Sequence, residues 1–100
     1  MAAKTAQQIY DEIMAHARKE GGSLSNWYGG ITSDIGTRLH SEHGVPREGH
    51  WFAWREAISS EHARSAEAAL LRNGMDGGTG GGDNTALFVY AYKKTNITSP

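Results

Sequence analysis

Apolar residues near the start of the chain recur with the period of an α-helix. They stand four positions apart: Ile9, Ile13 and Ala17. Thr5 precedes this run and Gln8 follows three positions later, which is the pattern of a capping box. Gly21 and Gly22 then supply a stop signal. The spacing predicts a helix over residues 5–19.

Serine marks two further helix starts. Ser33 is the predicted N-cap of a short helix, with Asp34 favourably placed in its first turn. That helix ends near the sequence His-Gly-Val-Pro at 43–46. A third helix begins at Ser59 and ends at Asn73-Gly74. Its apolar residues have helical spacing: Ala63, Ala66, Leu70 and Leu71.

Three segments have patterns typical of strands. Residues 25–31 contain Gly29-Gly30, where a side chain or ligand can approach the backbone closely. In residues 51–58, one face of the predicted strand carries Phe52, Trp54 and Ile58. Residues 86–93 alternate with a period of two, so three aromatic residues share one face: Phe88, Tyr90 and Tyr92.

The order of these elements is αβαβα–loop–β. It predicts a small α/β (α+β) domain in which a three-stranded sheet is flanked by three helices. We expect residues 1–94 to form this single domain and residues 95–100 to form a flexible tail.

Composition excludes several classes of protein and of metal site. Ten Lys and Arg stand against eleven Asp and Glu, a net charge of −1, which excludes a polycationic nucleic-acid tail. The chain has no cysteine, so disulfides and thiolate metal sites are excluded. No apolar run reaches the roughly 18–20 residues that cross a bilayer. We therefore expect a cytoplasmic protein with no membrane partner.

Six of the thirteen glycines lie between positions 74 and 82. The loop they form, residues 74–84, precedes the last strand and matches neither a P-loop nor a dinucleotide fingerprint. Its amides are candidates for an anion-binding nest, at Gly77, Gly78, Thr79 and Gly80. Asp76 and Asp83 are candidates for a hard cation. The alternative is a flexible connector.

One set of polar residues follows a recognisable order. Tyr28-Gly29-Gly30 lies on a strand, a polar turn follows, and Arg38 falls on the next predicted helix. Downstream, Ala63 precedes Glu67 by four positions on a helix that serine initiates. This order, over about residues 25–72, resembles the second half of the GIY-YIG nuclease domain.

The resemblance implies a metal-dependent phosphodiesterase that acts on nucleic acid. Tyr28 would then orient the attacking water, and Arg38 would hold the phosphate through a planar, permanently charged group. Glu67 would bind Mg²⁺ or Mn²⁺ through its carboxylate oxygens. His43 is a further candidate on the same predicted helix as Arg38.

The chain departs from the family at its first strand, because no Gly-Ile-Tyr strand precedes Tyr28, and Gly29 replaces an isoleucine. The C-terminal strand carries tyrosines where the family normally has no strand. We therefore predict that it takes the vacant position beside Tyr28 and brings Tyr90 or Tyr92 to the site.

Other interpretations stay open. Tyr28 is also explained as a packed strand residue, Arg38 as a partner of Glu42, and Glu67 as an exposed helix residue. His40, His43 and His50 are explained as surface residues or as zinc ligands.

The near-neutral charge disfavours strong unspecific binding to duplex DNA. Alternative functions are a non-catalytic module that binds a nucleotide or another small anion, and a homo-oligomeric protein with interface residues among Trp27, Trp51 and Trp54.

Overall fold

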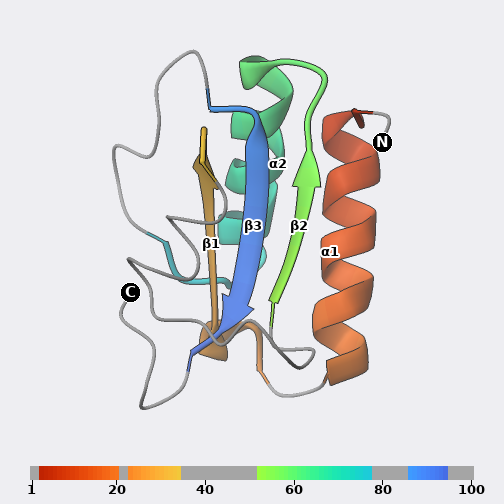
Figure 1. The fold of residues 1–100 in the computed structure, drawn as a ribbon. Coiled ribbons are helices and arrows are strands. Elements are labelled where there is room, and N and C mark those ends of the chain that lie inside the picture. The colour runs from red at the N-terminus through yellow and green to blue at the C-terminus, as the bar shows by residue number, and fades with distance from the viewer. Residues whose placement is uncertain (1–2, 21–22, 35–51, 78–85, 95–100) are drawn as a thin grey trace.

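The computed structural model describes residues 3–20, 23–34, 52–77 and 86–94. Along the chain, the elements are α1 (Ala6–Glu20), a short 3₁₀ helix (Leu24–Asn26), β1 (Trp27–Thr32), β2 (Phe52–Glu56), α2 (Ser60–Arg72) and β3 (Phe88–Lys93) (Figure 1). The mixed α/β class is confirmed. The described residues hold two α-helices where three were predicted. The helix expected from Ser33 and the tail 95–100 lie outside them.

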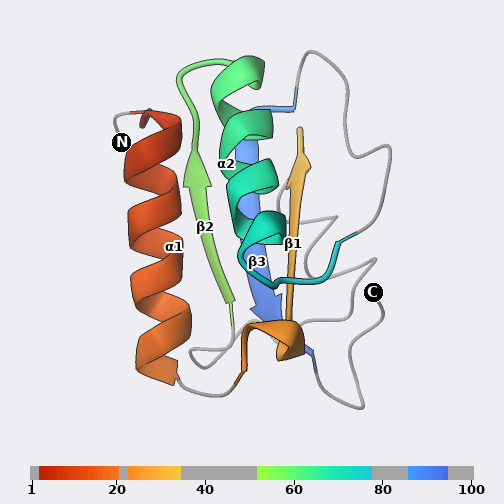
Figure 2. The ribbon, with the colours of Figure 1, turned by 180° about the vertical axis from the view of Figure 1, so that it is seen from behind.

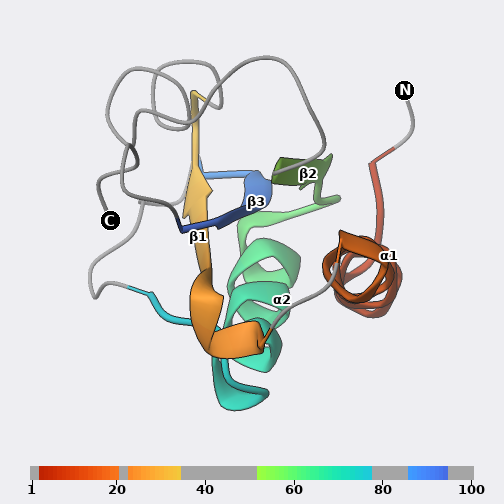
Figure 3. The same ribbon diagram turned by 90° about the horizontal axis from the view of Figure 1, so that it is seen from below.

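The sheet has its last strand in the middle. The strand order is β1-β3-β2, and β3 pairs antiparallel with both neighbours. Both α-helices pack on the same face of this sheet, with α2 over β3 and β1, and α1 beside β2 (Figures 2 and 3). The opposite face therefore carries the alternate side chains of all three strands.

The start of α1 is fixed by two kinds of cap. The capping box is present. The backbone amide of Gln8 donates to Thr5 Oγ1 at 3.3 Å, and the backbone amide of Thr5 donates to the side-chain Oε1 of Gln8 at 2.9 Å. The Ala6 amide donates to His62 Nδ1 of α2 at 2.9 Å. A long-range contact thus satisfies an amide that the helix itself leaves without an acceptor.

α2 begins after a serine and ends before a glycine, as the sequence predicts. The Ser59 hydroxyl accepts a hydrogen bond from the His62 amide at 3.2 Å, which is an N-cap contact. The helix ends at Arg72, with Asn73 as its C-cap. Gly74 follows with φ of +120°, a backbone conformation that a residue with a side chain rarely adopts.

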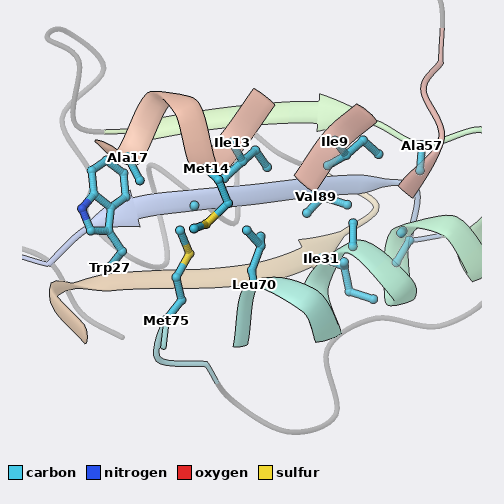
Figure 4. Packing of buried hydrophobic residues seen from close by; sticks show 14 residues of the cluster. Ile9, Ile13, Met14, Ala17, Trp27, Ile31, Ala57, Leu70, Met75 and Val89 are labelled. Carbon is cyan, nitrogen blue, oxygen red and sulfur yellow. The ribbon is translucent and has the colours of Figure 1, made fainter. Parts of the chain in front are cut away.

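The main core lies between the helices and the sheet (Figure 4). The apolar stripe of α1 is buried, as are Leu70 of α2 and Val89 of β3. Trp27 is fully buried, and its ring meets that of His16 edge-on at a centroid distance of 5.9 Å. The suggestion that Trp27 is an exposed interface residue is therefore wrong. Trp54 is half-buried, and Trp51 lies outside the described residues.

A charged cluster fastens the N-terminal segment to β2. Glu12 of α1 accepts from Arg55 Nε at 2.6 Å and pairs with Lys4 Nζ at 3.0 Å. These two partners hold the pKa of Glu12 below its ordinary value. Arg55 also donates to the carbonyl of Trp54 at 2.7 Å, and the Lys4 backbone pairs with that of Ala57. Part of the outer edge of β2 is thereby occupied.

Candidate functional site

A cluster of tyrosines lies on the face of the sheet opposite to α1 and α2. Tyr28 of β1 stands directly opposite Tyr92 of β3, and their rings stack at a centroid distance of 5.4 Å. Tyr90 lies two residues along β3, with its ring at 6.5 Å from that of Tyr92. Phe52 and Trp54 of β2 pack against this group. With Phe88 of β3, whose ring meets that of Trp54 edge-on at a centroid distance of 5.7 Å, six aromatic side chains of the described strands share this face.

The pairing of β3 with β1 confirms one specific prediction. The C-terminal strand does lie beside Tyr28, and it contributes a second tyrosine in direct register. The sequence analysis offered either Tyr90 or Tyr92 as the tyrosine brought to the site. The register selects Tyr92 as the partner of Tyr28, whereas Tyr90 stands opposite Gly30.

These tyrosines are buried. Tyr28 is 8% exposed, and Tyr90 and Tyr92 are 0% exposed. The ring of Tyr90 crosses Gly30 so closely that a Cβ atom there would lie 2.4 Å from the Tyr90 hydroxyl oxygen. Gly30 therefore gives Tyr90 the space in which its ring lies.

Glu67 lies in the other layer of the domain. It is carried by α2, which packs on the opposite face of the sheet from Tyr28. Helical spacing places Glu67 on the side of α2 away from Ser65 and Ala69, which face α1. Leu71, one turn further on the same side, lies beside Gly77 near the outer edge of β1. Tyr28 and Glu67 thus flank β1 from different layers.

The carboxyl of Glu67 is half-buried and makes no hydrogen bond or ion pair with the residues the structure describes. Burial raises its pKa above the ordinary value for glutamate, and the positive charge of Arg64 opposes this rise only in part. A carboxylate oxygen without a protein partner is a suitable ligand for a hard cation.

We expect Glu67→Gln to stabilise the fold at neutral pH. Burial disfavours the charged carboxylate in the folded state, so stability falls as pH rises from the ordinary glutamate pKa of 4.5 through the raised folded value. Glutamine has no charge to bury. Urea unfolding in EDTA would show the advantage of the variant near pH 7 and its disappearance at acid pH.

Glu61→Gln is the matched control. Glu61 is exposed in the first turn of α2, where a negative charge is favourable, so its replacement should cost stability slightly at neutral pH. A Glu67→Gln variant that is less stable than the parent at pH 7 would contradict the argument from burial.

The start of the glycine-rich loop is tied to β1. The Gly29 amide donates to the Asp76 carbonyl at 2.9 Å, and the Asp76 amide donates to the Trp27 carbonyl at 2.8 Å. The Asp76 side chain accepts from the Gly77 amide at 2.9 Å and from Lys94 Nζ at 3.1 Å. These contacts lower the pKa of Asp76. The Gly77 amide therefore already has an acceptor, and both carboxylate oxygens of Asp76 have donors.

Several predicted site residues lie outside the described ranges: Arg38, His43, Gly78, Thr79 and Gly80. Within those ranges, no group of three or more His, Cys, Asp or Glu side chains is placed to hold a metal ion. The described helices also include none with the length and apolar character needed to cross a membrane.

Known proteins do not identify the chain. Comparison with models of protein families, with curated protein sequences and with solved structures found no match. Indications of function therefore come from the tyrosine cluster, from Glu67 and from the order of residues along the chain.

Sequence reasoning did not foresee two members of the aromatic cluster. Phe52 and Trp54 were placed on one face of their strand, but the partner of that strand was unknown. Their register with Tyr92 and Tyr90 places them in the cluster. The only available signal was the shared period of two in both strands.

Proposed function

We propose that this protein is a divergent GIY-YIG-like phosphodiesterase that cleaves nucleic acid with Mg²⁺ or Mn²⁺. The observation that carries the proposal is the stacked pair of Tyr28 and Tyr92 on neighbouring antiparallel strands. It supports the interpretation that the C-terminal strand replaces the tyrosine-bearing strand that the sequence lacks before Tyr28.

The proposed roles follow from the chemistry of each group. The Tyr28 hydroxyl would orient a water molecule for attack on phosphorus, and Arg38 would neutralise the phosphate with two parallel hydrogen bonds. Glu67 would hold the cation, since its carboxyl has no partner among the described residues. The bound cation would stabilise the charge that develops on the phosphoryl oxygens.

Cleavage of supercoiled plasmid in Mg²⁺ or Mn²⁺ tests this proposal. We expect nicked product from the parent protein, and at least a tenfold lower rate from Glu67→Ala and Tyr28→Phe. Glu61→Ala is the matched control for Glu67→Ala, because Glu61 is an exposed glutamate in the first turn of the same helix. Lack of nicking with both metals would refute the enzymatic proposal, as would equal nicking by the parent and Glu67→Ala.

A second candidate function is a binding module of the same fold for a nucleotide or another small anion. Two observations favour it: Tyr28 is buried, and Glu67 lies in the opposite layer. The two residues proposed for catalysis therefore do not share one face of the sheet. The binding module predicts a rise in melting temperature with a nucleotide, absent in Arg38→Ala, together with no plasmid cleavage.

A further inference from the structure

A groove lies between α1 and α2, away from the tyrosine cluster. Its volume is about 400 Å³, which is within the size range of sites for small molecules. Tyr10 lines it from α1, and Arg72 and Asn73 line it from the C-terminal end of α2. Neither Tyr28 nor Glu67 contributes to it, so the groove is separate from the proposed phosphodiesterase site.

The hollow arises where small residues of the two helices meet. Ala6 of α1 and Ala69 of α2 both line the groove, and both are half-buried. Neither side chain extends beyond Cβ, so the space between the helices beside the Tyr10 ring is not filled. The lining thus offers an aromatic ring and alanine methyl groups to an apolar ligand body.

Among the described residues that line the groove, the only charged side chain is that of Arg72. Arg72 is exposed and makes no ion pair with any described residue. A cation in the last turn of a helix is favourable by itself, so Arg72 alone would not indicate a ligand. The indication comes from the combination of this guanidinium with the adjacent hollow.

The neutral polar groups add hydrogen-bonding capacity. The Asn73 side-chain nitrogen donates to the Ala69 carbonyl at 2.7 Å, which fixes the orientation of the amide. Gln7 donates to Asp11 at 2.9 Å and is held in the same way at the α1 side. Two polar groups are therefore positioned before any ligand arrives, which reduces the entropy lost on binding.

We propose that this groove binds a small organic anion. Its carboxylate or phosphate pairs with Arg72, and its apolar body packs on Tyr10 and against Ala69. The groove is open to solvent, so binding depends on both contacts together. Because its walls come from two helices, an occupant that binds only the folded state raises the melting temperature.

Titration followed by amide and side-chain NMR tests this site with three probes: phenyl phosphate, benzoate and inorganic phosphate. We expect phenyl phosphate or benzoate to shift signals of Tyr10, Ala69 and Arg72, and the tighter of the two identifies the preferred anion. Inorganic phosphate should bind at least tenfold more weakly, because it lacks a body that packs on Tyr10.

Two variants separate the contacts. Arg72→Gln removes the charge and Ala69→Leu fills the hollow, and each should weaken the tighter probe at least tenfold. Arg18→Gln is the matched control, since Arg18 is an exposed arginine in the last turn of α1. Unfolding curves establish that each variant is folded before titration.

The proposal fails if neither organic probe shifts the three groove residues at millimolar concentration. It also fails if Arg72→Gln binds as tightly as the parent, or if inorganic phosphate binds as tightly as phenyl phosphate. None of these outcomes depends on cleavage of nucleic acid.

Discussion

Gly30→Ala should lower the free energy of unfolding by about 1–3 kcal/mol, the usual cost of overpacking a well-packed core. The new Cβ would lie 2.4 Å from the Tyr90 hydroxyl oxygen and 2.6 Å from the ring carbon that carries it. Tyr90 is fully buried between β1 and β2, so its ring cannot move aside without displacing neighbours.

The adjacent glycine provides the control. A Cβ at Gly29 would meet Leu70 and Met75 at 3.6 Å, which is ordinary van der Waals contact. Gly29→Ala should therefore be nearly neutral, since it also reduces the freedom of the unfolded chain. Urea unfolding of both variants measures the difference, and equal stability of the two would contradict the proposed role of Gly30.

The same Gly30→Ala change should cost less when Tyr90 is already shortened. In a Tyr90→Leu background the clash with the ring is gone, so the two substitutions should not be additive. Additive losses would mean that the alanine acts through a contact other than Tyr90.

Leu70→Ala should lower the free energy of unfolding by about 2–5 kcal/mol, as large-to-small changes in a core do. Leu70 is 0% exposed and lies where α2 contacts β1, with its side chain 3.6 Å from the site of a Cβ on Gly29. Its loss opens a cavity beneath β1, next to Met75.

Leu71→Ala is the matched control one residue further along the helix. Leu71 is only half-buried, so its truncation should cost less than that of Leu70. Chemical unfolding monitored by tryptophan fluorescence measures both. An equal or larger loss at Leu71 would show that the contact between α2 and β1 is not centred on Leu70.

Local signals accounted for most of the described elements. The caps of both helices are contacts between residues three positions apart, Thr5 with Gln8 and Ser59 with His62. The helix starts were therefore visible in the sequence. The alternation in β3 likewise placed Val89 and Tyr90 on opposite faces of the strand, and in the structure Val89 lies toward the helices and Tyr90 away from them. Such patterns depend on the period of the backbone, which any single element reveals.

Contacts between distant segments were harder to predict from the sequence. The acceptor for the Ala6 amide is His62, and the partner of Asp76 is Lys94, and neither pairing has a sequence spacing that would reveal it. Glu67 could be placed on a helix, but its burial depends on how α2 meets β1. The position of β3 beside Tyr28 was predicted only through the family resemblance, because alternation alone does not define strand neighbours.

The central position of β3 has a consequence for how the chain folds. β1 and β2 each find their hydrogen-bonding partner in β3, which follows both of them in the sequence, and more than half of the given sequence separates β1 from β3. High sequence separation between paired residues slows folding, because the entropy lost on closing the long loop must be paid before the pairing contacts form. During synthesis, the two earlier strands emerge without that partner, so sheet closure must wait until the residues of β3 have left the ribosome.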